Sequence, residues 1–154
     1  MSLCLSDCPL CRDPVHAPPE AGVQLLLQRS RYRVVRVLDE AFPAFYRVIW
    51  QAHVAEFSDL EAAERTACMD AVIAVERALR EQLQPRKVNL ATLGNVVPHL
   101  HWHVIARFDW DSHFPAPIWA AAQRQADAAQ LAALAQALPA LDGAVLAALR
   151  ALPD

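Results

Sequence analysis

The chain contains no hydrophobic run long enough to cross a membrane. A transmembrane helix needs about 18 or more consecutive apolar residues, and polar residues interrupt every apolar stretch before that length. Residues 1–7 also lack the basic segment followed by a hydrophobic segment that marks a secretory signal. We therefore expect a cytoplasmic protein with no membrane partner.

Clusters of positive charge are also missing. The formal net charge is -3 at pH 7, and the Lys and Arg residues form no basic run. Binding to a nucleic-acid polymer depends on such charge, because phosphate contacts supply much of the affinity. The sequence therefore favours a small nucleotide over a nucleic-acid polymer as partner.

Three histidines stand at every second position, as His99, His101 and His103. In a strand, side chains alternate between the two faces, so these three would share one face while the apolar residues between them pack on the other. Buried imidazoles need hydrogen-bond partners, and a row of three is difficult to bury without a polar ligand. Two alternatives stay open at this point: purely structural burial, and a metal bound by two of the three.

The length of this row argues against one ion held by all three histidines. At about 3.3 Å of rise per residue, the Cα atoms of His99 and His103 would lie roughly 13 Å apart. Metal–nitrogen bonds are only about 2.0 to 2.1 Å long. An extended ligand with several oxyanions, such as a phosphate chain, fits the row better.

The segment His99–Ile105 matches the His-φ-His-φ-His-φ-φ signature, φ being apolar, of the histidine-triad (HIT) nucleotide hydrolases and transferases. The chain resembles this family over about residues 8–119. Lys87–Leu90 resembles the strand before the triad, and Gly94–Pro98 the loop that leads into it. His113–Trp119 is similar to the tail that follows the triad in a bacterial subgroup.

The resemblance implies an enzyme that cleaves a nucleoside phosphoanhydride or phosphoramidate, of the dinucleoside polyphosphate or adenosine phosphoramidate type, through a covalent nucleotidyl-histidine. His101 is then the nucleophile, which suits a neutral imidazole near pH 7. His99 orients the site, and His103 lies toward the phosphate and the bridging oxygen. Neutral donors to phosphate oxygens are expected from three further residues: Asn89, Gly94 and Asn95.

Two residues that relatives often carry are missing. A fourth histidine is absent near Leu38–Asp39, and Val96 stands where relatives have a serine or threonine. A hydroxyl or histidine that helps the leaving group is typically worth about 10²- to 10⁴-fold in rate. A nucleotide-binding sensor with weak turnover is therefore the alternative function.

Cys8 and Cys11 form a C-x-x-C pair, which in a reducing compartment resembles half of a metal site more than a disulfide. Some HIT relatives complete a zinc site with such a pair and histidines, one of them from the triad. Phe45 occupies the place where such relatives carry a histidine. We therefore expect two reduced thiols and no cofactor for the chemistry. A zinc-binding structural protein that uses Cys8, Cys11 and His99 is the third hypothesis.

Hydrophobic periodicity predicts an α+β fold, with an antiparallel sheet of about five strands and one long helix packed on it. The resemblance implies that this fold is of the HIT type. A capping box at Ser58–Glu61 predicts the start of the helix, and Pro85 its end. The expected strands are 23–28, 32–38, 45–50, 87–92 and 99–107.

Residues 120–154 contain 15 alanines and differ in composition from the rest. We divide the chain into a HIT domain over 1–119 and an alanine-rich helical extension over 120–154. Apolar residues at three- and four-residue steps predict two short helices, interrupted at Pro139. They would cover the domain or contribute to a dimer interface, and the resemblance implies a homodimer.

Overall fold

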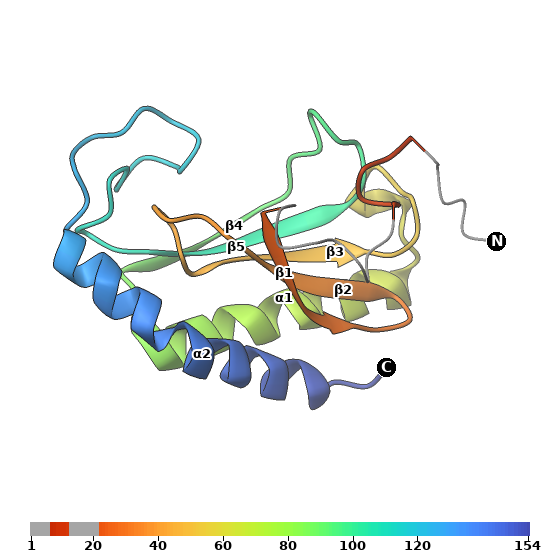
Figure 1. Ribbon diagram of the computed structural model, residues 1–154. Helices are drawn as coiled ribbons and strands as arrows, with labels where there is room; N and C mark the ends of the chain where they lie inside the picture. The colour runs from red at the N-terminus through yellow and green to blue at the C-terminus, as the bar shows by residue number, and fades with distance from the viewer. Residues whose placement is uncertain (1–6, 13–21) are drawn as a thin grey trace.

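The structure, a computed structural model, describes residues 7–12 and 22–154. Five antiparallel strands form one sheet in the order β1-β2-β3-β5-β4, and this confirms the predicted α+β fold. The helices α1 (Ala62–Leu83) and α2 (Ala128–Arg150) lie on the same side of this sheet (Figure 1). The strands are β1 Val23–Gln28, β2 Tyr32–Val37, β3 Phe45–Trp50, β4 Lys87–Ala91 and β5 His101–Arg107.

The strands follow the predicted segments closely, but β5 begins at His101 and not at His99. Because β3 ends at Trp50, the ladder between these strands stops at the pair of Ile49 with His101. Beyond it the His99 N–H donates to the Val97 carbonyl oxygen, at 2.8 Å. His99 is therefore a loop residue, and the strand's alternation does not fix its side chain.

Helix α1 begins at Ala62 with Glu61 as its N-cap, three residues later than the capping box with Ser58 as N-cap predicted. Leu60 is extended and 2% exposed, so its burial in the core interrupts the helical path. Residues 57–59 before it form only a 3-10 turn. Glu61 and Glu64 form the capping box of α1, in which each side chain accepts a hydrogen bond from the other residue's backbone N–H.

Residues 128–150 form one continuous helix, so the predicted break at Pro139 is wrong. A proline removes one backbone hydrogen bond and destabilises an isolated helix by about 3 kcal/mol. Here Leu134 lies before Pro139 and Leu141 and Val145 after it, and all three are buried in the main core. Packing on both sides of the proline therefore offsets the lost bond.

Asp142 anchors α2 to the sheet. One carboxylate oxygen accepts from the Tyr46 hydroxyl at 2.7 Å, and the Arg36 guanidinium donates from 3.1 Å. By length and composition alone, α2 would also qualify as a membrane-crossing helix. In the structure it packs along α1 and β1.

The two faces of the sheet differ in what covers them. Tyr46, Val48 and Val104 point toward the helices and belong to the main core cluster. Phe45 and Ile105 point to the other face, where they form a second, smaller cluster with Phe42. The side chains of β5 that alternate with Val104 therefore lie on the face opposite α1 and α2.

Candidate active site and Cys/His cluster

His101 and His103 lie side by side on the face of β5 that points away from α1 and α2. Trp102 and Val104 alternate with them and pack in the main core, as the period of two predicted. His101 is 9% exposed and His103 is 4% exposed. Their ring centroids are 4.8 Å apart. The strand thus presents two neighbouring imidazoles in a largely desolvated position.

One hydrogen bond fixes the tautomer of His101. Its Nδ1 lies 2.6 Å from the backbone carbonyl oxygen of His99, which can only accept, so Nδ1 carries the proton. The lone pair is then on Nε2, the atom suited to attack an electrophile. Burial lowers the pKa of His101, and this hydrogen bond opposes the shift. The imidazole is therefore neutral and nucleophilic near pH 7.

His103 is enclosed by aromatic rings. The centroids of Phe45 and Trp119 lie 5.4 Å and 5.2 Å from its own. Within residues 7–12 and 22–154, its Nδ1 is buried without a hydrogen-bond partner. Burial lowers the pKa of His103 to about 3, and the charge of Arg47 contributes in the same direction. His103 is thus a neutral imidazole, and its Nδ1 makes no hydrogen bond to the described residues.

The ring of His99 belongs to a different group of side chains. Its Nδ1 lies 3.4 Å from Sγ of both Cys8 and Cys11, and Cys11 Sγ lies 3.3 Å from His53 Nδ1. The four ligand atoms lie within 4.8 Å of one another. His99 Nε2 donates to the Trp50 carbonyl oxygen at 2.6 Å, which leaves the Nδ1 lone pair toward the cysteines.

These separations fit a tetrahedral zinc ion. With Zn–S bonds of about 2.3 Å and Zn–N bonds of about 2.05 Å, a tetrahedron places sulfur and nitrogen about 3.6 Å apart. Four protein ligands would leave no open position, which is typical of a structural site. The donor set Cys8, Cys11, His53 and His99 therefore fits zinc in number, type and spacing.

The expectation that this ligand set is incomplete is wrong. Sequence reasoning placed the missing histidine at Phe45, which begins β3 and packs in the second apolar cluster. His53 supplies the ligand from the loop after β3. This loop returns to the triad segment, because the Leu100 N–H donates to the Val54 carbonyl oxygen at 2.7 Å.

The HIT-domain family model matches residues 19–110, which includes the sheet, α1 and the triad. The chain belongs to the HIT-domain family. Proteins of this family are generally nucleotide hydrolases or transferases. No curated protein matches the chain.

Solved HIT structures share the fold. A histidine triad protein from Bradyrhizobium japonicum is 29% identical, with 82% of this chain and 95% of that chain covered and a TM-score of 0.64. One from Marinobacter aquaeolei VT8 is 21% identical, with 87% and 93% covered and a TM-score of 0.67. A Zn-bound HIT family protein from Mycobacterium smegmatis is 20% identical, with 78% and 86% covered and a TM-score of 0.51.

Asn89 lies on the triad's side of the HIT domain. It is on β4, opposite Ile105, and its Oδ1 accepts from Arg107 Nη1 at 2.7 Å. This bond leaves the amide nitrogen as the donor. Gly94 and Asn95 lie in the β4–β5 loop, which rises from the sheet on the side opposite the helices (Figure 1). Gly94 has a φ of +73°, a conformation that glycine adopts easily.

The tail after β5 is held by a buried ion pair. Arg107 Nε lies 2.8 Å from Asp111 Oδ2, and the two side chains are 1% and 3% exposed. Asp111 also accepts from three backbone N–H groups, and these bonds together with Arg107 keep its pKa low against the opposing effect of burial. Arg107 further donates to the Ala116 carbonyl oxygen at 2.8 Å. The tail therefore holds Trp119 against His103.

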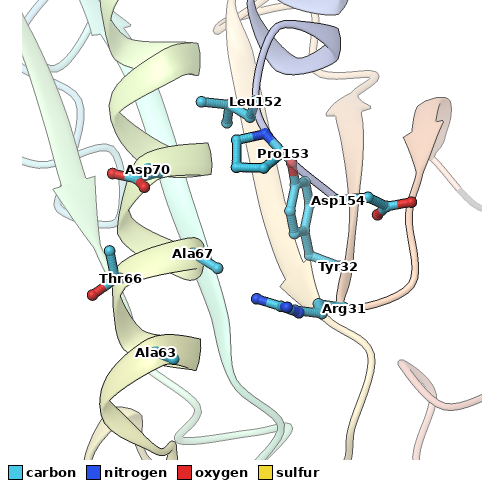
Figure 2. Close-up of a pocket in the computed structure, with 9 residues that line it drawn as sticks. All are labelled: Arg31, Tyr32, Ala63, Thr66, Ala67, Asp70, Leu152, Pro153 and Asp154. Atoms are coloured by element: carbon cyan, nitrogen blue, oxygen red, sulfur yellow. The ribbon is translucent and has the colours of Figure 1, made fainter.

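A separate pocket lies on the side of the sheet that α1 and α2 cover (Figure 2). It opens between α1 and the C-terminal residues, with Tyr32 between them. The sheet separates this pocket from His101 and His103, because Tyr32 packs in the helix-facing core. The pocket therefore takes no part in the triad's chemistry.

Proposed function

We propose that the protein is a nucleotide hydrolase or nucleotidyl transferase that cleaves a nucleoside phosphoanhydride or phosphoramidate through a covalent nucleotidyl group on His101. The observation that carries this proposal is the hydrogen bond from His101 Nδ1 to the His99 carbonyl oxygen, at 2.6 Å. It leaves Nε2 unprotonated, as a nucleophile must be. Membership of the HIT family supports the same class of reaction.

In the first step, His101 Nε2 attacks the α-phosphorus of the nucleotide. A nitrogen–phosphorus bond forms, and the bond from phosphorus to the leaving group breaks with its electron pair. Water then attacks the same phosphorus, which releases the nucleoside monophosphate and returns the electron pair to Nε2. A neutral His103 carries one ring N–H, so it serves as a hydrogen-bond donor to the bridging oxygen and not as a cationic acid.

The oxygens of the transferring group need donors that do not reorganise during the reaction. Asn89 offers its amide nitrogen, because its carbonyl oxygen is held by Arg107. Gly94 and Asn95 would supply donors from the β4–β5 loop. Small nucleotides are therefore the proposed partners of this face.

The test measures release of the nucleoside monophosphate from diadenosine tetraphosphate and from adenosine phosphoramidate. We expect His101→Ala to lose activity by about 10⁴-fold or more, because covalent catalysis ends with the nucleophile. Rapid acid-free quenching and mass spectrometry of the wild type should detect one added nucleotidyl group on His101. The control is His113→Ala, whose ring contacts Phe42 outside the triad. Full activity of His101→Ala would overturn the assignment.

The same assay tests the sensor alternative, which Val96 favours. Its side chain is 92% exposed in the β4–β5 loop and has no hydroxyl for the leaving group. Tight binding of AMP in calorimetry, with no product over many hours, would identify a sensor.

We also propose that Cys8, Cys11, His53 and His99 hold a structural zinc ion. The donor set and its spacing support this, as does the Zn-bound HIT protein from Mycobacterium smegmatis, whose fold is similar. The ion would tie residues 7–12 to the segment before β5. Metal analysis of protein purified without a histidine tag should find about one zinc per chain. Cys8→Ser should lose it, whereas Cys68→Ala, on α1, should keep it.

The implied homodimer is a further proposal. β4 is an edge strand of the sheet, and Leu90 and Leu93 near it are exposed at 37% and 49%. Edge strands and exposed apolar residues are common at interfaces. Light scattering after gel filtration should give twice the mass of the chain, and a mass of one chain would overturn this proposal.

A further inference from the structure

Arg47 is an arginine of the triad face that sequence reasoning did not single out. It lies on β3 directly opposite His103, so the two side chains share the face of the sheet opposite α1 and α2. Its guanidinium carbon is 5.3 Å from the centroid of the Phe45 ring. Arg47 therefore stands beside the histidine that lies next to the nucleophile.

The charge of Arg47 has no anionic partner in residues 7–12 and 22–154. Its Nε is fully buried without a hydrogen-bond acceptor, and no carboxylate forms an ion pair with it there. A cation over the Phe45 ring gains too little to replace a hydrogen-bond acceptor. Two other arginines of the sheet are paired with buried or half-buried carboxylates: Arg36 with Asp142 and Arg107 with Asp111.

The positive potential of Arg47 reaches the triad. Its charge contributes to lowering the pKa of His103, after burial and the neighbouring His101. The buried carboxylate of Asp111 does not pair with Arg47, because Arg107 and backbone N–H groups already donate to it. The face beside His103 is therefore prepared for an anion. A guanidinium is suited to phosphate, because its N–H groups match two phosphate oxygens at once.

We propose that Arg47 binds the leaving group when this group is itself a phosphate, and that it makes the enzyme selective for phosphoanhydrides over phosphoramidates. The proposal rests on the proposed function, in which His101 attacks and His103 faces the bridging oxygen. Arg47 lies beside His103 and so on the leaving-group side of the reacting phosphorus. The substrate class is a nucleoside monophosphate joined to a further phosphate.

The chemistry of the two leaving groups explains the selectivity. When Nε2 of His101 bonds to phosphorus, a phosphate leaving group departs with the electron pair of the broken P–O bond and gains negative charge. A nearby guanidinium stabilises that charge without a proton transfer. An amine leaving group departs from a P–N bond, must take up a proton and gains no negative charge. Arg47 gives it no such help. The presence of Val96 in place of a serine or threonine is consistent with this selectivity, because a phosphate leaving group depends less on a hydroxyl donor than an amine does.

The test compares kcat/KM for diadenosine tetraphosphate and for adenosine phosphoramidate, which carry the same nucleotidyl group. Arg47→Met should lower the value for the anhydride by about 10²- to 10³-fold, the effect of removing one charge-stabilising group. The value for the phosphoramidate should change by less than about threefold. Arg47→Lys should recover part of the loss, because the lysine ammonium keeps the positive charge but cannot bind two phosphate oxygens side by side as a guanidinium does. The control is Arg80→Met, an exposed arginine on α1.

Equal losses on both substrates, or no loss on either, would overturn the proposal. A binding measurement separates its failure from that of the proposed function. Wild type should bind the non-hydrolysable α,β-methylene ADP at least about tenfold more tightly than AMP, and Arg47→Met should abolish that difference. If neither substrate turns over, the proposed function fails, and the affinities for the two nucleotides alone test whether Arg47 binds the second phosphate. Equal affinities of the wild type for α,β-methylene ADP and AMP would then refute the proposal for Arg47.

Discussion

Acid should destabilise this protein through the buried histidines of the triad, and His103 offers the sharpest test. Its ring is 4% exposed, and burial lowers its pKa to about 3. In the unfolded chain an imidazole has a pKa of about 6.5. The unfolded chain therefore binds a proton that the folded chain excludes. Stability rises with pH between these two values and is lost as the pH falls below about 6.5.

The magnitude follows from the two pKa values. Between pH 7 and pH 5, the linkage relation assigns to His103 a loss of about 2 kcal/mol in the free energy of unfolding. This figure depends on the unfolded pKa and is nearly the same for any folded pKa below about 4. Burial lowers the pKa values of His99 and His101 as well, so they act in the same direction. The total loss should exceed that of His103 alone.

The assay is urea unfolding of wild type and His103→Gln at pH 7 and pH 5, followed by tryptophan fluorescence. Glutamine fills a similar space and does not titrate. The variant should lose about 2 kcal/mol less than wild type between the two pH values. Both proteins carry the same group of Cys8, Cys11, His53 and His99. The effects of acid on that group therefore cancel when the stability losses of the two proteins are subtracted. Identical pH dependence in the two proteins would refute the reasoning.

Three further changes test the surroundings of the site. Asp142→Ala should lower the free energy of unfolding by about 2 to 3 kcal/mol in urea, because a buried tyrosine hydroxyl and an arginine lose their acceptor; a loss below about 0.5 kcal/mol would contradict the anchoring role of α2. Asp111→Asn should cost about 3 to 5 kcal/mol in the same assay, since it leaves Arg107 buried without its counter-charge. Trp119→Ala should raise the pKa of His103 toward its ordinary value by admitting water, as NMR titration of labelled histidine would measure. An unchanged titration would show that Trp119 does not shield it.

Local patterns predicted most of the fold. Alternation and β-branched runs located the five strands, because a half-buried sheet imposes a period of two on the sequence. The same alternation placed His101 and His103 together. The boundaries of the helices depended on tertiary packing instead. Leu60 delays α1 because it is buried in the core, and Pro139 does not break α2 because residues on both sides of it are buried.

The surroundings of the triad could not be predicted from local patterns. His53 joins two cysteines about forty residues away, and only the path of the loop after β3 brings them together. Arg47 faces His103 through the register of two strands that are distant in sequence. The one sequence signal for the role of Arg47 was a charged residue within an otherwise apolar and aromatic strand, two positions after Phe45 and so on the same face of the strand.

The position of His99 separates what its backbone does from what its side chain does. The carbonyl oxygen orients His101, whereas the ring lies among Cys8, Cys11 and His53. A substitution such as His99→Ala keeps the carbonyl oxygen and removes only the ring. Substitution of the three histidines of this motif should therefore give two kinds of defect. Changes at His101 and His103 should remove the chemistry, whereas a change at His99 should loosen the attachment of residues 7–12.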